Sequence, residues 1–533
     1  MHLLQRPWPS LALALVAGAG FSAFPAASTG LSSLAVLFAL WWRATPRRAA
    51  AMGFAWGIGA YVCGLRWIHH ALHDLGAVSL AISLPVLAFI VLVLSAYIAA
   101  ACAAACALFA RPGARALAFA PAWCAAEYVR SHFFIGFPWL LAGDTQIDGV
   151  LGAFARVGGV YGVGLVMVLA AAGIVALARW HLLAGVLALC ALSLDPRPAV
   201  VQSNDPQWRI AMVRQPVSVE RPHVDPEAPG TFDWYRDETA RVPAGVDLIL
   251  WPEHVVSTWA HELAAPLDAL SSHMDARDGA LLLGLPVQEP DGHYYNAALG
   301  FGRAHGRYDK RERVPFVEHT PYETWLGRPV ALIARKLGDF TRGATPATLV
   351  AHGRNIATAI CYEAAFPEQV RANIVAANDP ALLFLPSSDL WYGGPQGRAQ
   401  MLRMARMRAM EHGIGVARVA TSGESVLIDG SGRVLHRQAP DDPARLEGAL
   451  PTTAQAGLWT RYGMRTVAVG AVLLLMLACA IDGARRRFRV PAPPPPPRGT
   501  TPGPCSSSPP TPSADRSRRR CPPPPARAAG RPG

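Results

Sequence analysis

Asn355-Ile-Ala-Thr-Ala-Ile-Cys361-Tyr362-Glu363 is the stretch of this sequence that most directly predicts a fold and a chemistry. Its short apolar, β-branched run predicts a buried strand, which ends on a thiol followed by a carboxylate. A cysteine between a strand and a turn can be presented to a substrate while the scaffold behind it stays rigid. Free cysteines also commonly pack as small hydrophobic residues, so this stretch alone leaves packing open as an alternative.

The position of the other cysteines favours reactivity. They lie in apolar segments or in the C-terminal tail, at Cys63, Cys102, Cys106, Cys124, Cys190, Cys479, Cys505 and Cys521. Cys361 is therefore the one thiol in the polar middle of the chain, and it has no disulfide partner there. In an oxidising compartment such a thiol is better explained by reactivity than by packing.

The composition indicates a membrane protein. Of the 533 residues, 52% are hydrophobic and only 16% are charged, a balance unusual for a soluble chain. The formal net charge of +12 does not indicate nucleic-acid binding, because the basic residues lie in short loops and in the tail. They form no single basic face interleaved with aromatic residues.

The first 195 residues predict a bundle of about seven transmembrane helices. The apolar runs lie near 9–24, 31–42, 51–69, 77–109, 115–129, 158–178 and 181–194. A cleaved signal peptide is the alternative for the first run, since Arg6 and Pro25-Ala-Ala-Ser28 roughly fit one. The further spans behind it favour a retained helix.

Loop charges predict the orientation. Arginines fall in alternate connections, which by the positive-inside rule places the N-terminus in the cytoplasm and the chain after 195 outside. A last apolar run, 464–481, precedes the basic anchor 485–489, which places the C-terminal end in the cytoplasm as well. We therefore predict a bundle over 1–195, an outer domain over 196–460, a final helix with its anchor over 461–489, and a disordered Pro/Arg-rich tail over 490–533.

The aromatic loop 131–141 is too short to span a bilayer. An interfacial or re-entrant segment and a plain loop packed on neighbouring helices both remain open.

Residues 196–460 predict a layered α/β domain. Continuous apolar runs of strand length alternate with polar, helix-compatible stretches, which is typical of strands covered on both faces. The expected strands are 210–213, 246–251, 280–287, 297–301, 355–360, 382–386, 414–420 and 425–429, and 401–412 reads as a helix.

Three other strand ends in this domain carry polar groups. They are Trp251-Pro252-Glu253, Tyr308-Asp309-Lys310 and Ser388-Asp389-Leu-Trp391. Each alone has an ordinary explanation as a surface or turn residue. Together with Cys361 they supply what acyl transfer needs: a nucleophile, a carboxylate base, and a cation where an oxyanion develops.

In this order, Glu253, Lys310 and Cys361 resemble the Glu-Lys-Cys triad of the nitrilase superfamily. The whole chain, over roughly 5–485, is similar to the membrane-integrated apolipoprotein N-acyltransferase family. The motifs that carry this resemblance are Gly136-Phe-Pro-Trp-Leu-Leu141, Val157-Gly-Gly-Val-Tyr-Gly162, Val314-Pro-Phe-Val-Glu318 and Met404-Ala-Arg-Met-Arg-Ala-Met-Glu411. The resemblance implies a polytopic α-helical membrane domain joined to a periplasmic, nitrilase-like αββα sandwich.

The resemblance also implies roles. Glu253 would be the general base, Cys361 the nucleophile that holds an acyl chain as a thioester, and Lys310 the cation at the oxyanion, with the N–H of Tyr362 as a second donor. The supporting residues would be Glu318, Tyr362, Glu363, Asp389 and Trp391. The implied partners are a phospholipid acyl donor, a diacylated apolipoprotein acceptor and the lipid of a bacterial inner membrane, with no cofactor, metal or nucleic acid.

The chain departs from the family pattern at Val317, Ser388 and Ser422. These positions put the substrate preference in doubt and leave the triad intact. Two alternatives remain: a membrane-tethered nitrilase-type amidase or conjugal-transfer nitrilase-like protein with another acceptor, and a non-catalytic membrane scaffold. An amidase that acts on a soluble substrate would not need seven membrane helices. A scaffold that had lost its activity would not be expected to keep Glu253, Lys310 and Cys361 intact.

Overall fold

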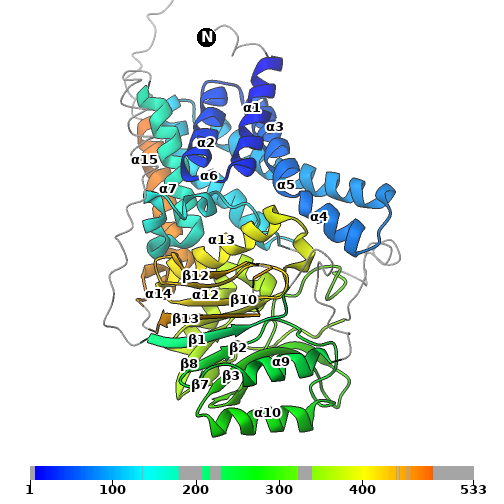
Figure 1. The fold of residues 1–533 in the computed structure, drawn as a ribbon. Helices are drawn as coiled ribbons and strands as arrows, with labels where there is room; N and C mark the ends of the chain where they lie inside the picture. The colour runs from blue at the N-terminus through cyan, green and yellow to red at the C-terminus, as the bar shows by residue number, and fades with distance from the viewer. Residues whose placement is uncertain are drawn as a thin grey trace, which may run out of the picture. The chain divides into compact units, whose positions relative to one another are not determined.

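The computed structural model describes residues 7–134, 136–178, 207–216, 230–321, 339–439, 441–442, 444–452 and 455–483 (Figure 1). Its N-terminal part is helical and its middle part contains both helices and strands. The N-terminal helices are α1 (Pro7–Ala23), α2 (Ala27–Trp41), α3 (Pro46–Gly64), α4 (Arg66–His70), α5 (Leu80–Leu108), α6 (Pro112–His132) and α7 (Ala155–Ala178). A π-helical turn, Ala71–Leu75, follows α4, and 3-10 turns at Ala142–Gln146 and Val150–Phe154 precede α7.

Several of these helices can cross a bilayer. Among the described residues, three are by themselves long and apolar enough: Leu80–Leu108, Val150–Ala176 and Met464–Gly483, the last of which is α15. Pro7–Ala23 and Ala27–Trp41 are shorter apolar helices. Helices thus occupy the first six predicted intervals, while 181–194 lies outside the described residues. The domain limits at 195, 460 and 489 stay a prediction.

The middle part contains two β-sheets. The strands are β1 (Gln207–Val213), β2 (Leu248–Leu250), β3 (Ala280–Gln288), β4 (Tyr294–Gly302), β5 (Ala304–His305), β6 (Arg307–Asp309), β7 (Leu349–Ala351), β8 (Arg354–Thr358), β9 (Leu383–Ser387), β10 (Val416–Ala420), β11 (Ser425–Ile428), β12 (Val434–Gln438) and β13 (Arg445–Pro451). One sheet has the order β13-β1-β2-β3-β4-β6 and the other β12-β11-β10-β9-β8-β7-β5. The central strands β1-β2-β3 and β8-β9-β10 run parallel, and antiparallel strands flank them. The carboxyl ends of the parallel strands therefore gather at one edge of each sheet.

Alternate residues of the strands fill two different layers. From β1 and β2, Met212 and Leu250 join the core between the two sheets, where they meet residues such as Phe384. Their neighbours Ala211 and Ile249 instead pack under the helices α9 (Thr231–Ala240) and α10 (Ala264–Ala276). Figure 1 shows α9 and α10 along the outer side of this sheet. Because successive strand side chains point to opposite faces, both faces of each central strand are covered.

Helices α12 (Pro367–Ala377) and α13 (Pro395–His412) cover the outer face of the second sheet, which completes an αββα arrangement. This confirms the predicted fold class of a nitrilase-like α/β domain joined to apolar helices. Buried residues of α13 belong to the same hydrophobic core as those of the N-terminal apolar helices. The short helix α14 (Leu458–Tyr462) leads from the α/β domain into α15.

The aromatic loop between α6 and α7 packs into the protein at one end and is exposed at the other. Trp139 is fully buried, whereas Phe133 and Phe134 are exposed. The buried end packs on its neighbours as a plain loop would, and whether the exposed end lies at a lipid interface stays a prediction.

Candidate active site

Cys361 lies where a central strand ends. Strand β8 stops at Thr358, and Cys361 begins a 3-10 turn, Cys361–Ala365. Its φ of 50° lies in the left-handed region, which costs energy for a residue with a side chain. Such strain is common where a fold presents a functional side chain. The thiol is buried, with 3% of the residue exposed.

A lysine held between two carboxylates faces this turn. Lys310 Nζ donates to Glu253 Oε1 and to Glu318 Oε1, both at 2.9 Å. Asn296 Nδ2 donates to the same two oxygens at 2.8 and 3.0 Å. All four residues are at most 5% exposed. The amide and the ammonium thus hold two carboxylates together that would otherwise repel one another.

The peptide of Ser388 connects the carboxylate to the thiol. Its N–H donates to Glu253 Oε2 at 2.9 Å, and its carbonyl accepts from Cys361 Sγ at 3.7 Å. The structure therefore brings together Glu253, Lys310 and Cys361, which come from three strand ends, and adds Glu318 to them.

The electrostatics keep the resting thiol protonated. Burial, reinforced by the Glu253 carboxylate and opposed by Lys310, raises the pKa of Cys361 to about 12. Burial would lower the pKa of Lys310, but Glu253 and Glu318 outweigh it and hold that pKa well above its ordinary value. The thiol therefore needs a base to become a nucleophile, and Lys310 stays cationic.

Glu318 is held in its charged form despite its burial. Burial would raise its pKa, but Lys310 and the Val314 N–H, which donates at 2.8 Å, lower it below the ordinary value. Glu318 sits in a tight loop with Phe316 at a φ of 67°. This loop aims the carboxylate at Lys310.

Glu363 accepts hydrogen bonds from one side chain and from backbone N–H groups on both sides of the site. Its carboxylate accepts from the Tyr308 hydroxyl at 2.8 and 3.0 Å, from the N–H of Arg311 at 2.7 Å and from the N–H of Glu312 at 3.0 Å. It also accepts from the N–H of Ile360 at 2.7 Å. One buried carboxylate thus ties the segment after Lys310 to the residue before Cys361.

Asp389 and Trp391 lie in the 3-10 turn Asp389–Tyr392 that follows β9. Asp389 is fully buried and accepts from Arg418 Nη2 at 2.6 Å and from Ser387 Oγ at 3.0 Å. Its contacts are therefore those of a structural ion pair beneath the turn. Trp391 is half-buried in the same turn.

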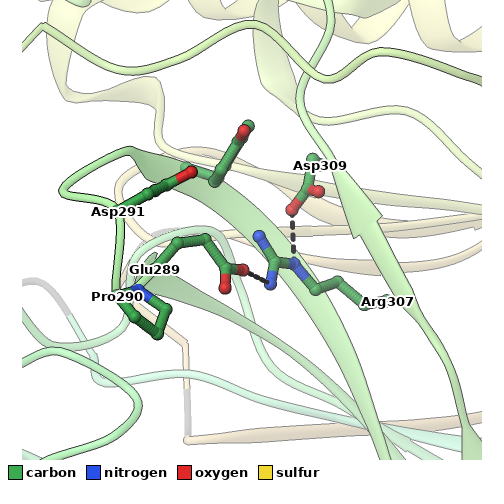
Figure 2. Close-up of a pocket in the computed structure, with 6 residues that line it drawn as sticks. Glu289, Pro290, Asp291, Arg307 and Asp309 are labelled. Atoms are coloured by element: carbon green, nitrogen blue, oxygen red, sulfur yellow. Dashed lines mark hydrogen bonds and ion pairs between the residues drawn. The ribbon is translucent and has the colours of Figure 1, made fainter.

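The face of β6 opposite Lys310 carries a separate polar cavity of about 530 Å³ (Figure 2). Figure 2 shows Arg307 between Asp309, at 2.6 Å, and Glu289. Side chains alternate along a strand, so Arg307 and Asp309 point away from the face that carries Lys310.

Sequence reasoning missed Asn296 and the Ser388 peptide. Asn296 is a polar residue inside the apolar strand β4, and a buried polar residue there requires a partner. That position was the available signal. The Ser388 contacts are made by backbone atoms, which every residue type has, so the sequence cannot reveal them.

A two-sheet α/β domain with Glu253, Lys310 and Cys361 at its strand ends, joined to bilayer-length helices, defines a membrane-integrated member of the carbon-nitrogen hydrolase class. Family models agree along the chain: the apolipoprotein N-acyltransferase N-terminal domain matches residues 13–173, and carbon-nitrogen hydrolase matches 172–446. The chain belongs to the apolipoprotein N-acyltransferase family.

Relatives support this membership over nearly the full length. The chain is 34% identical to the apolipoprotein N-acyltransferase of Azotobacter vinelandii, over 92% of this chain and 99% of that protein. It is 35% identical to that of Pseudomonas paraeruginosa, over 91% and 98%. Among solved structures it is similar to a carbon-nitrogen hydrolase from Helicobacter pylori, with 13% identity, a TM-score of 0.35, and coverage of 53% of this chain and 99% of that one. The predicted family is confirmed.

Proposed function

We propose that this protein is an apolipoprotein N-acyltransferase, which moves a fatty acyl chain from a phospholipid to the α-amino group of a diacylglyceryl-cysteine. The observation that carries the proposal is a buried thiol at a strand end, in the same site as a buried lysine that is ion-paired with two carboxylates. Family membership supplies the substrate classes.

The first half-reaction forms a thioester. Glu253 takes the proton of Cys361 as the sulfur attacks the ester carbonyl of the phospholipid, and a tetrahedral oxyanion forms. Lys310 stabilises that oxyanion, together with the backbone N–H of Tyr362. The carbon–oxygen bond then breaks, the leaving alkoxide takes the proton from Glu253, and a lysophospholipid departs.

The second half-reaction uses the same groups in reverse. The neutral α-amine of the acceptor attacks the thioester carbonyl, and Lys310 again stabilises the oxyanion. The carbon–sulfur bond breaks, the amine proton passes through Glu253 to the leaving thiolate, and an amide is left on the acceptor. Glu318 accepts from Lys310 and holds it in place through both halves, and Asn296 in turn donates to Glu318.

The location follows from loop charge. We place the protein in the bacterial inner membrane, with the α/β domain facing the periplasm and both termini in the cytoplasm. In this arrangement 1–195 and 461–489 hold the membrane helices, 196–460 is the catalytic domain, and 490–533 is a cytoplasmic tail. Three described helices of bilayer-crossing length and hydropathy are consistent with it.

Complementation tests the proposal. A bacterial host whose own N-acyltransferase can be shut off receives either this chain or its Cys361→Ser variant, and lipoprotein N-termini are analysed by mass spectrometry. We expect triacylated termini with the native chain and diacylated termini with the variant. Diacylated termini with both chains would refute N-acylation and favour the amidase alternative.

A further inference from the structure

One tryptophan from the membrane-side loop packs on both segments that flank the nucleophile. The ring of Trp139 stacks on Tyr362 at 5.7 Å and 22°, and on Tyr392 at 6.0 Å and 30°. Tyr362 directly follows Cys361, and Tyr392 ends the turn that follows Ser388. Trp139 therefore packs on the residue after Cys361 and on the turn after Ser388, whose carbonyl accepts from the Cys361 thiol.

A single glutamine of α13 holds this ring. Gln400 Oε1 accepts from Trp139 Nε1 at 2.9 Å and from Trp67 Nε1 at 3.2 Å. Its Nε2 donates to the carbonyl of Gly64 at 2.9 Å. Each lone pair of the amide oxygen accepts from one indole N–H, and only 8% of the residue is exposed. Water cannot easily replace these bonds.

The backbone of the loop is fixed independently. Arg130, which is 2% exposed, donates to the carbonyls of Phe137 at 2.9 Å, Trp139 at 2.7 Å and Leu140 at 3.2 Å. Non-helical backbone at membrane depth needs such internal partners. Because Arg130 holds the main chain, Gln400 is left to set the tilt of the Trp139 ring.

We infer that Gln400 is a positioning residue of the acyl-transfer reaction, which acts through Trp139 on the backbone around Cys361 and Tyr362. The inference rests on the proposed function. Without Gln400 the two indole N–H groups lose their acceptor in a buried site, and the ring shifts to find another. A displacement of the nucleophile by about 1 Å can slow a reaction about 100-fold.

The test compares two glutamines on the same helix. Gln400→Leu removes the acceptor of both indoles. The matched control is Gln396→Leu, because Gln396 Nε2 donates at 2.9 Å to the Cys63 carbonyl, beside Gly64. Within the described part of the chain, both indole N–H groups donate to Gln400 and neither donates to Gln396. Full-length variants in mixed micelles with phospholipid are followed by intact-protein mass, which reports acyl-thioester formation on Cys361. We expect kcat to fall about 10- to 100-fold in Gln400→Leu with KM within about twofold of the native value, and both constants to stay within about twofold in Gln396→Leu.

A double-mutant cycle identifies the route. Trp139→Phe keeps an aromatic ring and removes the indole N–H, so Gln400→Leu should add little to its effect. If Gln400→Leu fails to fold, as judged by its thermal unfolding, Trp139→Phe alone should show the same fall in kcat. Equal losses in both glutamine variants, full rates in both Gln400→Leu and Trp139→Phe, or additive effects would overturn the inference. A native protein that forms no thioester would instead refute the proposed function.

Discussion

Replacing Lys310 by methionine should destabilise the protein, and the loss of stability should be larger at pH 7 than at pH 5. The native ammonium donates at 2.9 Å to Glu253 and Glu318. Methionine leaves both carboxylates buried without a cation, so one of them must be protonated for the fold to persist. At pH 7, protonating a glutamate whose unfolded pKa is 4.5 costs about 3 kcal/mol, because each pH unit is worth about 1.4 kcal/mol.

The native and variant proteins should respond to pH in opposite directions. Native Glu318 has a lowered pKa, so its contribution to stability is complete above pH 4.5 and is lost as the pH falls through the folded value. In Lys310→Met one glutamate stays protonated in the folded state, so the pH dependence of stability is reversed. The free energy of protonating that glutamate is absent below pH 4.5 and grows as the pH rises to 7. We expect a thermal unfolding midpoint about 6–12 °C below the native one at pH 7, and a much smaller gap at pH 5.

The assay is tryptophan fluorescence of the full-length protein in detergent between pH 5 and 7.5. Arg307→Met is the matched control, because Arg307 begins the strand that ends just before Lys310 and also meets two carboxylates, Glu289 and Asp309, but on an open face (Figure 2). Its side chain is 29% exposed, so its loss should cost at most about 1 kcal/mol. A native-like midpoint for Lys310→Met at pH 7, or an equal loss at pH 5 and pH 7, would show that the carboxylates are not held as described.

Three further outcomes follow from the site. Because burial raises the pKa of Cys361 to about 12, alkylation of the resting thiol by iodoacetamide should rise about tenfold per pH unit from pH 7 to 9, as measured on its peptide by mass spectrometry. Glu363→Gln should slow thioester formation about 100-fold in a folded protein, because an amide cannot accept all the bonds that Tyr308 and the backbone donate. Asp389→Asn breaks the buried pair with Arg418 and should lower the free energy of unfolding by about 3–5 kcal/mol, as seen in thermal unfolding.

Each outcome has a clear contrary. A plateau in alkylation below pH 8 would mean that the resting site already holds a thiolate. A native rate in Glu363→Gln would remove that carboxylate from the positioning of the nucleophile. An unchanged midpoint in Asp389→Asn would mean that Arg418 finds another acceptor.

The sequence marks a candidate site residue most clearly where a polar side chain follows an apolar strand. Glu253 and Cys361 come just after the buried runs of β2 and β8, so the change from apolar to polar marks them. Asn296 carries no such mark, because it lies within a strand and its role appears only when Glu253 and Glu318 converge on it. Convergence of distant segments is a property of the fold and not of any local pattern.

The same distinction explains which strands were missed. Strand β13, Arg445–Pro451, pairs along its length with β1, yet its sequence has no apolar run because its side chains are only partly covered. Backbone hydrogen bonds form it, with little help from burial. Strands of two or three residues, such as β5 and β6, are too short to show periodicity.

Helix α13 shows why the catalytic and membrane parts function as one unit. Its arginines suggest a solvated face, but Arg408 and Glu411 are buried and paired, and Glu411 Oε1 accepts from the Val160 N–H of α7 at 2.7 Å. Its methionines, among them Met404, pack in the same core as the membrane-type helices. Gln400, on the same helix, holds the indole that stacks beside the nucleophile. Removing the membrane helices would therefore expose an apolar face of α13 and also release the ring that orders the Cys361 turn. An isolated α/β domain would keep the triad residues while losing part of what positions them.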